Sequence, residues 1–231
     1  MNTDDSPPDT CPVNISLGNN NSRVSIITGS DLFPIRNPIT AEEVRAAQQE
    51  WANGLLKISQ AKIDGEDIIQ PAKELLDNLY AFGEFPVLFN PTKSRDKIFR
   101  STLKEALSYF VGYDAINQDF PDSGFAEDYG FAHNASMGWK EISFFNHQIV
   151  SLSDSAIAMG TYFFTATNGE RTDVDFTFGY RRSRFDGRIL IFLQHSSVQF
   201  RDVRKGKFTQ TISVDPVHWV SQNPDEVNSE D

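Results

Sequence analysis

Four consecutive segments rich in β-branched and aromatic residues constrain the fold of this chain more than any other feature. They cover residues 139–151, 155–167, 172–183 and 188–201. Asn168-Gly169 and Asp186-Gly187 stand between consecutive segments, where a tight hairpin turn requires a positive φ angle. This arrangement predicts an antiparallel meander, in which each strand pairs with the next one along the chain.

Helical patterns precede these strands. Thr40 and Glu43 have the spacing of a capping box, and apolar residues then recur every three or four positions as far as Ile58, which predicts a helix of about 20 residues. A second pattern begins at Ile69 and ends near Gly83. Helices followed by a long meander predict the α+β class.

Two shorter features lie between the helices and the meander. The apolar run over residues 85–89 predicts an extended segment. Thr102 and Glu105 form another capping box, which predicts a short helix reaching Phe110 and commits the Thr102 hydroxyl to the helix terminus.

The strands differ in their two faces. Along residues 172–180 apolar side chains alternate with polar ones, so one face of that strand meets water. The segment Ile189–Leu193 is instead apolar on both faces. Helices can cover only one of these, and a homodimer interface is the economical cover for the other.

The 231 residues suit one domain with tails, and we predict a flexible arm over 1–36, a folded domain over 37–205 and a C-terminal extension with an acidic tail over 206–231. The net charge of −11 argues against sequence-independent binding of nucleic acid, which requires clustered Lys and Arg. No apolar run approaches the roughly 20 residues of a membrane-spanning helix, so we expect no membrane insertion. The arm lacks the pattern of a signal or transit peptide and specifies no compartment.

Several common catalytic motifs are absent from the sequence. There is no phosphate-binding glycine loop and no Gly-x-Ser-x-Gly elbow. The histidines are far apart, without the paired spacing of zinc ligands. They are His133, His147, His195 and His218. We therefore predict no metal site, with a site assembled from distant strands as the alternative.

Three stretches together resemble a known family. They are LFNPTKSRDKIFRSTLKEALSYFVG (88–112), AMGTYFFTATNGERTDVDFTFGYRR (158–182) and LQHSSVQF (193–200). In order and spacing they resemble the iota-class carbonic anhydrases of algae, cyanobacteria and other bacteria, over about residues 38–202. The resemblance implies an NTF2-like cone, in which a curved antiparallel sheet wraps around a long N-terminal helix, and a homodimer.

The resemblance also implies the reversible hydration of carbon dioxide to bicarbonate. Both metal-free and manganese- or zinc-dependent members have been described, and the absence of paired histidines favours the metal-free chemistry here. The alternatives are a non-catalytic association module, like the kinase hub domains of the same fold, or an NTF2-like binder of small molecules. Members occur in plastids, cytoplasm and periplasm; a plastid is the best expectation for an alga, and cytoplasm or periplasm for a bacterium.

The family's proposed means of catalysis is a Thr, a Tyr and a Ser that converge on the cavity and orient water and bicarbonate. By motif these fall on Thr92 in NPTK, Tyr109 in LSYF and Ser197 in HSSV. Thr102 is the rival threonine and Ser196 the rival serine for binding substrate.

His195 and Ser197 share one face of the last strand, whereas Ser196 points to the other. Buried hydroxyls on an apolar strand need partners, which favours the His195–Ser197 face as the site, with His195 available to bind substrate and carry the proton. Tyr129 and Tyr180 are further candidates for lining the mouth of the cavity.

Overall fold

The structure is a computed structural model, and it describes residues 38–121 and 123–199. The chain divides into two units, Met1–Asn37 and Pro38–Asp231, and every element described below belongs to the second. The predicted arm over 1–36 and the extension over 206–231 lie outside the described residues.

The long first helix, α2, spans Ala41–Asp64. Its predicted capping box is present: the Thr40 amide donates to Glu43 Oε2 at 2.9 Å, and the Glu43 amide donates to Thr40 Oγ1 at 3.2 Å. The helix ends at Gly65, whose φ of 73° is a left-handed conformation that favours glycine. The capped start and the buried stripe of α2 confirm the sequence prediction.

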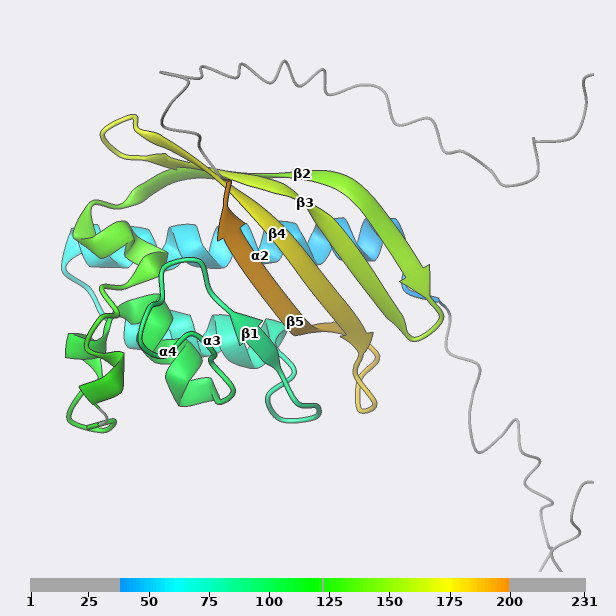
Figure 1. Ribbon diagram of the computed structural model, residues 1–231, viewed down its shortest axis with the longest axis horizontal. Coiled ribbons are helices and arrows are strands. Elements are labelled where there is room, and N and C mark those ends of the chain that lie inside the picture. Colours follow the sequence, from blue (N-terminus) through cyan, green and yellow to red (C-terminus); the bar gives the residue numbers. More distant parts are fainter. Residues whose placement is uncertain (1–37, 122, 200–231) are drawn as a thin grey trace, which may run out of the picture. The chain divides into compact units, whose positions relative to one another are not determined.

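The sheet has five strands in the order β1-β5-β4-β3-β2. The four long strands are β2 (Trp139–Leu152), β3 (Ser155–Ala166), β4 (Arg171–Arg182) and β5 (Ile189–Val198). Each pairs antiparallel with the next, and Gly169 and Gly187 have positive φ angles in the two predicted turns, so the meander is confirmed. Figure 1 shows this sheet curving over α2.

The apolar run before the meander contributes much less sheet than its length suggests. Only β1 (Leu88–Asn90) is a strand, and it pairs parallel with β5 through Leu88 and Leu193. Helix α3 spans Ile69–Leu79 and ends before the predicted Gly83, because Tyr80 is already extended and bridges to Ile191 of β5.

Helix α4 spans Leu103–Val111 and begins with the predicted Thr102–Glu105 capping box. Three short 3₁₀ turns follow it, over Tyr113–Ala115 (η1), Ser123–Phe125 (η2) and Phe131–Ser136 (η3). No helix within residues 38–121 and 123–199 is long and apolar enough to cross a membrane.

The core lies between α2 and the inner face of the sheet. Trp51 of α2 stacks on Tyr162 of β3 at 5.7 Å and meets Phe178 of β4 edge-on at 5.8 Å. Along β4, Phe176 and Phe178 are buried while Asp173 and Asp175 are not, as the alternation predicts. Aromatic rings therefore fill the space under the curved sheet.

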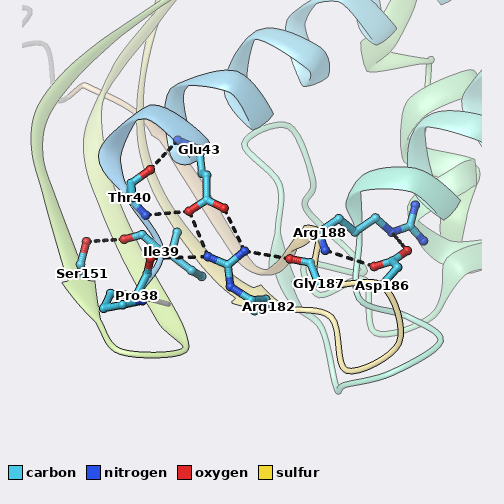
Figure 2. Close-up of polar contacts among 9 residues, drawn as sticks. All are labelled: Pro38, Ile39, Thr40, Glu43, Ser151, Arg182, Asp186, Gly187 and Arg188. Carbon is cyan, nitrogen blue, oxygen red and sulfur yellow. Dashed lines mark hydrogen bonds and ion pairs between the residues drawn. The ribbon is translucent and has the colours of Figure 1, made fainter. Parts of the chain in front are cut away.

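A bidentate ion pair joins the start of α2 to the end of β4. Arg182 donates from Nη1 to Glu43 Oε1 at 2.8 Å and from Nη2 to Glu43 Oε2 at 3.0 Å (Figure 2). Arg182 Nη1 also donates to the carbonyl of Gly187 in the following turn. Because Glu43 also completes the capping box with Thr40, one carboxylate orients both the helix and the strand end.

Candidate active site

The inner face of β5 carries Gln194 and Ser196, whereas His195 and Ser197 are exposed on the outer face. Gln194 is paired with Phe178 and Ser196 with Phe176, both of which point into the core. The predicted site face of His195 and Ser197 is thus the outer one. A register shift between β4 and β5 precedes these residues. Because the segment before them is apolar on both faces, its sequence pattern did not indicate which face is the inner one.

Ser196 is hydrogen-bonded to the hydroxyl of Tyr162, which projects from β3. Both side chains are buried. Burial raises the pKa of Tyr162 to about 12, although the nearby polar side chains of Ser196, Thr92 and Gln194 oppose the rise. The phenol is therefore protonated at neutral pH and can donate a hydrogen bond.

Thr92 follows β1 and directs its hydroxyl towards the same place. Its Oγ1 is buried and makes no hydrogen bond with the described residues, although it lies near enough to Tyr162 to lower the pKa of that hydroxyl. A buried hydroxyl without a partner is costly, so this atom is available for a ligand oxygen.

Tyr109 lies on α4 with its side chain buried. Its hydroxyl lies near the backbone of Lys93, the residue after Thr92, and burial raises its pKa well above the usual range. Tyr109 also lines a pocket of about 120 Å³, whose other lining residues include Lys93 and Tyr129. Because these two side chains are exposed, the pocket opens to solvent beside Tyr109.

The wall of this pocket includes a strained turn. Asn134, Ala135 and Ser136 have φ angles of 50°, 49° and 74°, an unusual run for residues other than glycine that costs about 1 kcal/mol or more at each. The buried ring of His133 stabilises the turn: Nδ1 accepts from the Ser136 amide, and Nε2 contacts the carbonyl of Val111 on α4, both at 2.9 Å. Burial lowers the pKa of His133, so the ring is neutral and Nε2 carries the proton.

A buried charged group lies behind Tyr109, and we call it the ionic cluster: Arg100, Asp128 and Ser108. Arg100 Nη2 donates to Asp128 Oδ1 at 2.8 Å, and Ser108 Oγ donates to Asp128 Oδ2 at 2.7 Å. Both charged side chains are fully buried. Since Ser108 precedes Tyr109 and Asp128 contributes to its pocket, this cluster connects α4 to the pocket wall.

Tyr80, Tyr162 and Gln194 also lie at the candidate site, and the sequence analysis did not predict them. Trp51 Nε1 donates to the Tyr80 hydroxyl at 2.9 Å, and the Tyr80 hydroxyl donates to Gln194 Oε1. We call Tyr80, Thr92, Tyr162, Gln194 and Ser196 the hydroxyl cluster. Gln194 is the signal that the sequence offered, because an amide two residues from Ser196 shares its strand face and needs buried partners.

The remaining predicted residues lie outside the inner face of β5. Thr102 caps α4, and Tyr129 stands at the pocket rim with 75% of its surface exposed. Tyr180 is buried on β4, where its hydroxyl lies near Gln48 of α2 and makes no hydrogen bond with the described residues. His195 lines a separate groove of about 420 Å³ on the outer side, beside Leu88.

The candidate site therefore consists of neutral hydrogen-bond donors surrounded by aromatic rings. Within residues 38–121 and 123–199, no group of three His, Cys, Asp or Glu residues lies together in a way that could hold a metal ion. Hydroxyl and amide groups in a dry, apolar setting can orient a small ligand and stabilise negative charge that develops on its oxygen atoms.

Comparison with known proteins gives this arrangement a family. The metal-independent carbonic anhydrase family matches residues 42–198. A metal-independent carbonic anhydrase of Nostoc sp. is 33% identical over 180 residues, which are 75% of this chain and 80% of that protein. The crystal structure of a cyanobacterial iota-carbonic anhydrase in complex with bicarbonate has a TM-score of 0.61 at 32% identity, and the match covers 73% of this chain and 98% of that one.

A weaker similarity links this chain to an NTF2-like protein. An NTF2-like protein of Shewanella oneidensis is 16% identical, with a TM-score of 0.39 and coverage of 69% of this chain and 99% of the other. The expected α+β fold, with a curved and unclosed sheet beside a long helix, is confirmed. The resemblance carried by the three sequence stretches is confirmed as well: this chain belongs to the metal-independent, iota-class family of carbonic anhydrases.

Proposed function

We propose that this chain catalyses the reversible hydration of carbon dioxide at Thr92, Tyr109, Tyr162 and Ser196, without a metal ion. The observation that carries the site assignment is the buried Thr92 hydroxyl, which has no partner among the described residues and faces the Tyr162–Ser196 pair. Ser196 takes the place that the sequence motif gave to Ser197, because only Ser196 lies on the inner face.

The reaction adds water to the carbon of carbon dioxide and releases one proton, which leaves bicarbonate. Carbon dioxide is apolar, and the aromatic rings that pack around Tyr162 give the hydroxyl groups an apolar setting that suits such a substrate. Negative charge develops on the two substrate oxygens as the water attacks, and donors already in position stabilise it. Burial raises the pKa of Tyr109, so its hydroxyl keeps its proton and can donate it to a ligand in the pocket that Tyr109 lines.

The test is an assay of carbon dioxide hydration by stopped flow, with and without EDTA, on the natural chain and two serine variants. We expect Ser196→Ala to lower kcat about 100-fold, the usual cost of removing a donor that stabilises transition-state charge. Ser197→Ala is the matched control, since the same change falls on the exposed face of the same strand, and we expect wild-type activity. Loss of activity in Ser197→Ala, with wild-type activity in Ser196→Ala, would instead place the site on the outer face of β5.

We further propose that the outer face of the sheet pairs with a second copy of the chain. Met159 of β3, Leu88 of β1 and Phe99 are 52%, 61% and 62% exposed, and Leu88 and Phe99 line the outer groove. Exposed apolar side chains gathered in this way mark interaction surfaces. The doubly apolar segment of β5 contributes Leu193 to the same groove.

Light scattering after size-exclusion chromatography tests the pairing. We expect twice the chain mass of 26.0 kDa for the natural protein and a single chain mass for Met159→Lys. A monomer at micromolar concentration would contradict the proposal, and a ring of many subunits would favour a hub-like assembly instead.

A further inference from the structure

The side chain of Glu127 collects backbone amides from the loop that carries Thr92. The Arg95 amide donates to both carboxylate oxygens of Glu127, at 2.8 and 2.9 Å. The amides of Asp96 and Lys97 donate to Glu127 Oε1 at 2.9 and 3.3 Å. Three consecutive amides therefore converge on one carboxylate, which lies 30 to 32 positions further along the chain.

The loop itself covers residues 91–99, between β1 and α4, and its two ends are close together. The Arg100 amide donates to the carbonyl of Phe89 at 2.8 Å, which closes the base of the loop. The Arg100 side chain forms the buried ion pair with Asp128, the residue after Glu127. Glu127 and Asp128 thus attach the loop to the rest of the fold at its middle and at its base.

Contacts inside the loop are local and weaker. Ser94 Oγ donates to the carbonyl of Pro91 at 3.2 Å. Arg95 pairs with its neighbour Asp96, but both side chains are mostly exposed, at 82% and 59%, and such surface pairs contribute little stability. These contacts shape the loop without attaching it to another element.

Glu127 is charged when it binds the loop. Burial alone would raise its pKa, but the amides of residues 95–97 together hold the pKa below the usual value. The carboxylate is therefore ionised at neutral pH. Hydrogen bonds to an ionised acceptor are roughly twice as strong as those between neutral groups, so this anchor is a firm one.

The anchored loop borders the candidate site. Lys93, next to Thr92, lines the same pocket as Glu127 and Tyr109. The Thr92 hydroxyl is buried and lies near the Tyr162 hydroxyl. The position of the loop therefore sets where the Thr92 oxygen stands relative to the other hydroxyls, and a displacement of about 1 Å in a reacting group can lower a rate about 100-fold.

We propose that Glu127 is a positioning residue, which binds the amides of residues 95–97 so that Thr92 on the same loop keeps its hydroxyl in the candidate site. The proposal rests on the proposed function, since it needs Thr92 to act on the substrate. Glu127 acts through Thr92, because its own oxygens are engaged by the three backbone amides.

Glu127→Gln tests the role with almost no change of shape. The substitution removes the charge and replaces one acceptor oxygen by an NH₂ group, which cannot accept from an amide. We expect kcat for carbon dioxide hydration to fall about tenfold, less than the roughly 100-fold that a full 1 Å displacement can cost. An unchanged kcat would overturn the proposal.

Glu105→Gln is the matched control. Glu105 Oε2 also accepts from two consecutive backbone amides, those of Ser101 and Thr102, at 2.6 and 2.9 Å. These amides belong to the cap of α4 and lie beyond the loop. We expect a lower melting temperature for Glu105→Gln and the kcat of the natural chain. Equal losses of kcat in the two variants would contradict a specific role for Glu127.

Hydrogen exchange measures the anchor without reference to activity. The amides of residues 95–97 should exchange faster in Glu127→Gln than in the natural chain, because they lose a charged acceptor. The amides of Ser101 and Thr102 should exchange at unchanged rates. Equal exchange at residues 95–97 in both proteins would show that Glu127 does not hold the loop, and would refute the proposal.

A double-mutant cycle separates the failure of this proposal from the failure of the proposed function. If Glu127 acts through Thr92, Glu127→Gln should have little further effect on kcat in a Thr92→Val protein, whereas two independent effects would multiply and contradict the proposal. An inactive natural chain would refute the proposed function, and the positioning role with it. An active natural chain that is impaired by Thr92→Val and unaffected by Glu127→Gln would refute only the positioning role.

Discussion

Two buried polar groups flank Tyr109, and they use different chemistry. The ionic cluster buries a full positive and a full negative charge in Arg100 and Asp128. The hydroxyl cluster buries only neutral groups, and its Thr92 hydroxyl makes no hydrogen bond with the described residues. Buried charges depend strongly on each other, so loss of one should appear chiefly as lost stability. Neutral hydroxyls contribute little net stability, so their loss should appear chiefly as lost activity.

The largest effect that tests this contrast is on stability. Asp128→Asn keeps the shape of the side chain but leaves the Arg100 charge buried without its counter-charge. We expect the free energy of unfolding to fall by about 3–5 kcal/mol. Denaturant titration followed by fluorescence measures it. Asp173→Asn is the control, because Asp173 pairs with Arg171 at the surface and should cost at most about 1 kcal/mol. Similar losses in both variants would remove the distinction.

Tyr109→Phe tests the other half of the contrast. Loss of a single donor beside the reacting oxygens should lower kcat about 100-fold. The free energy of unfolding should change by no more than about 1 kcal/mol, since the ring remains. Stopped-flow kinetics and thermal unfolding of the same preparation give both numbers. Tyr113→Phe, also close to the end of α4, serves as the control with full activity; a large loss of stability in Tyr109→Phe would place Tyr109 with the structural residues.

His133 adds a pH dependence at the far end of α4. Burial lowers its folded-state pKa below the usual value near 6.5, so the unfolded chain takes up the proton at a higher pH than the folded one. The free energy of unfolding should therefore fall as pH drops below about 6.5, by at most about 1.4 kcal/mol per pH unit. Urea titrations between pH 7 and 5 measure this slope. In His133→Gln the contribution should vanish, and an unchanged slope would show that another group causes it.

The smallest effect distinguishes the two threonines. Thr102→Ala removes the cap of α4 and should cost about 1 kcal/mol of stability without changing kcat. Thr92→Val removes the unpartnered hydroxyl and keeps the side-chain shape, so it should lower kcat and leave stability nearly unchanged. Thermal melts and hydration assays on both variants give the comparison. A loss of kcat in Thr102→Ala, with unchanged kcat in Thr92→Val, would make Thr102 the threonine of the site.

The fold was largely predictable because its signals are local. The Thr40 and Thr102 capping boxes, the glycine turns at 169 and 187, and the alternation along β4 each depend on neighbouring residues, and all are present. The early end of α3 was not predictable, because Tyr80 leaves the helix to pair with β5, far away in the chain.

The candidate site was predictable only in part. Motif resemblance identified Thr92 and Tyr109, and the structure places Tyr109 near the backbone of Lys93, the residue after Thr92. The site also needs Tyr80, Tyr162 and Gln194, which come from three separate elements and share no sequence motif. Their hydrogen bonds form only when the sheet packs against α2 in the folded chain.

The choice between Ser196 and Ser197 shows where local information ends. Strand periodicity establishes that neighbouring serines point to opposite faces, and this follows from the pleat of any β-strand. Which face is inner depends on the register with β4 and on the shift between Gly179 and Tyr180. The aromatic residues of the inner face pack against Trp51, which lies more than a hundred positions away from Tyr162 and Phe178, so the inner face is a property of the folded chain.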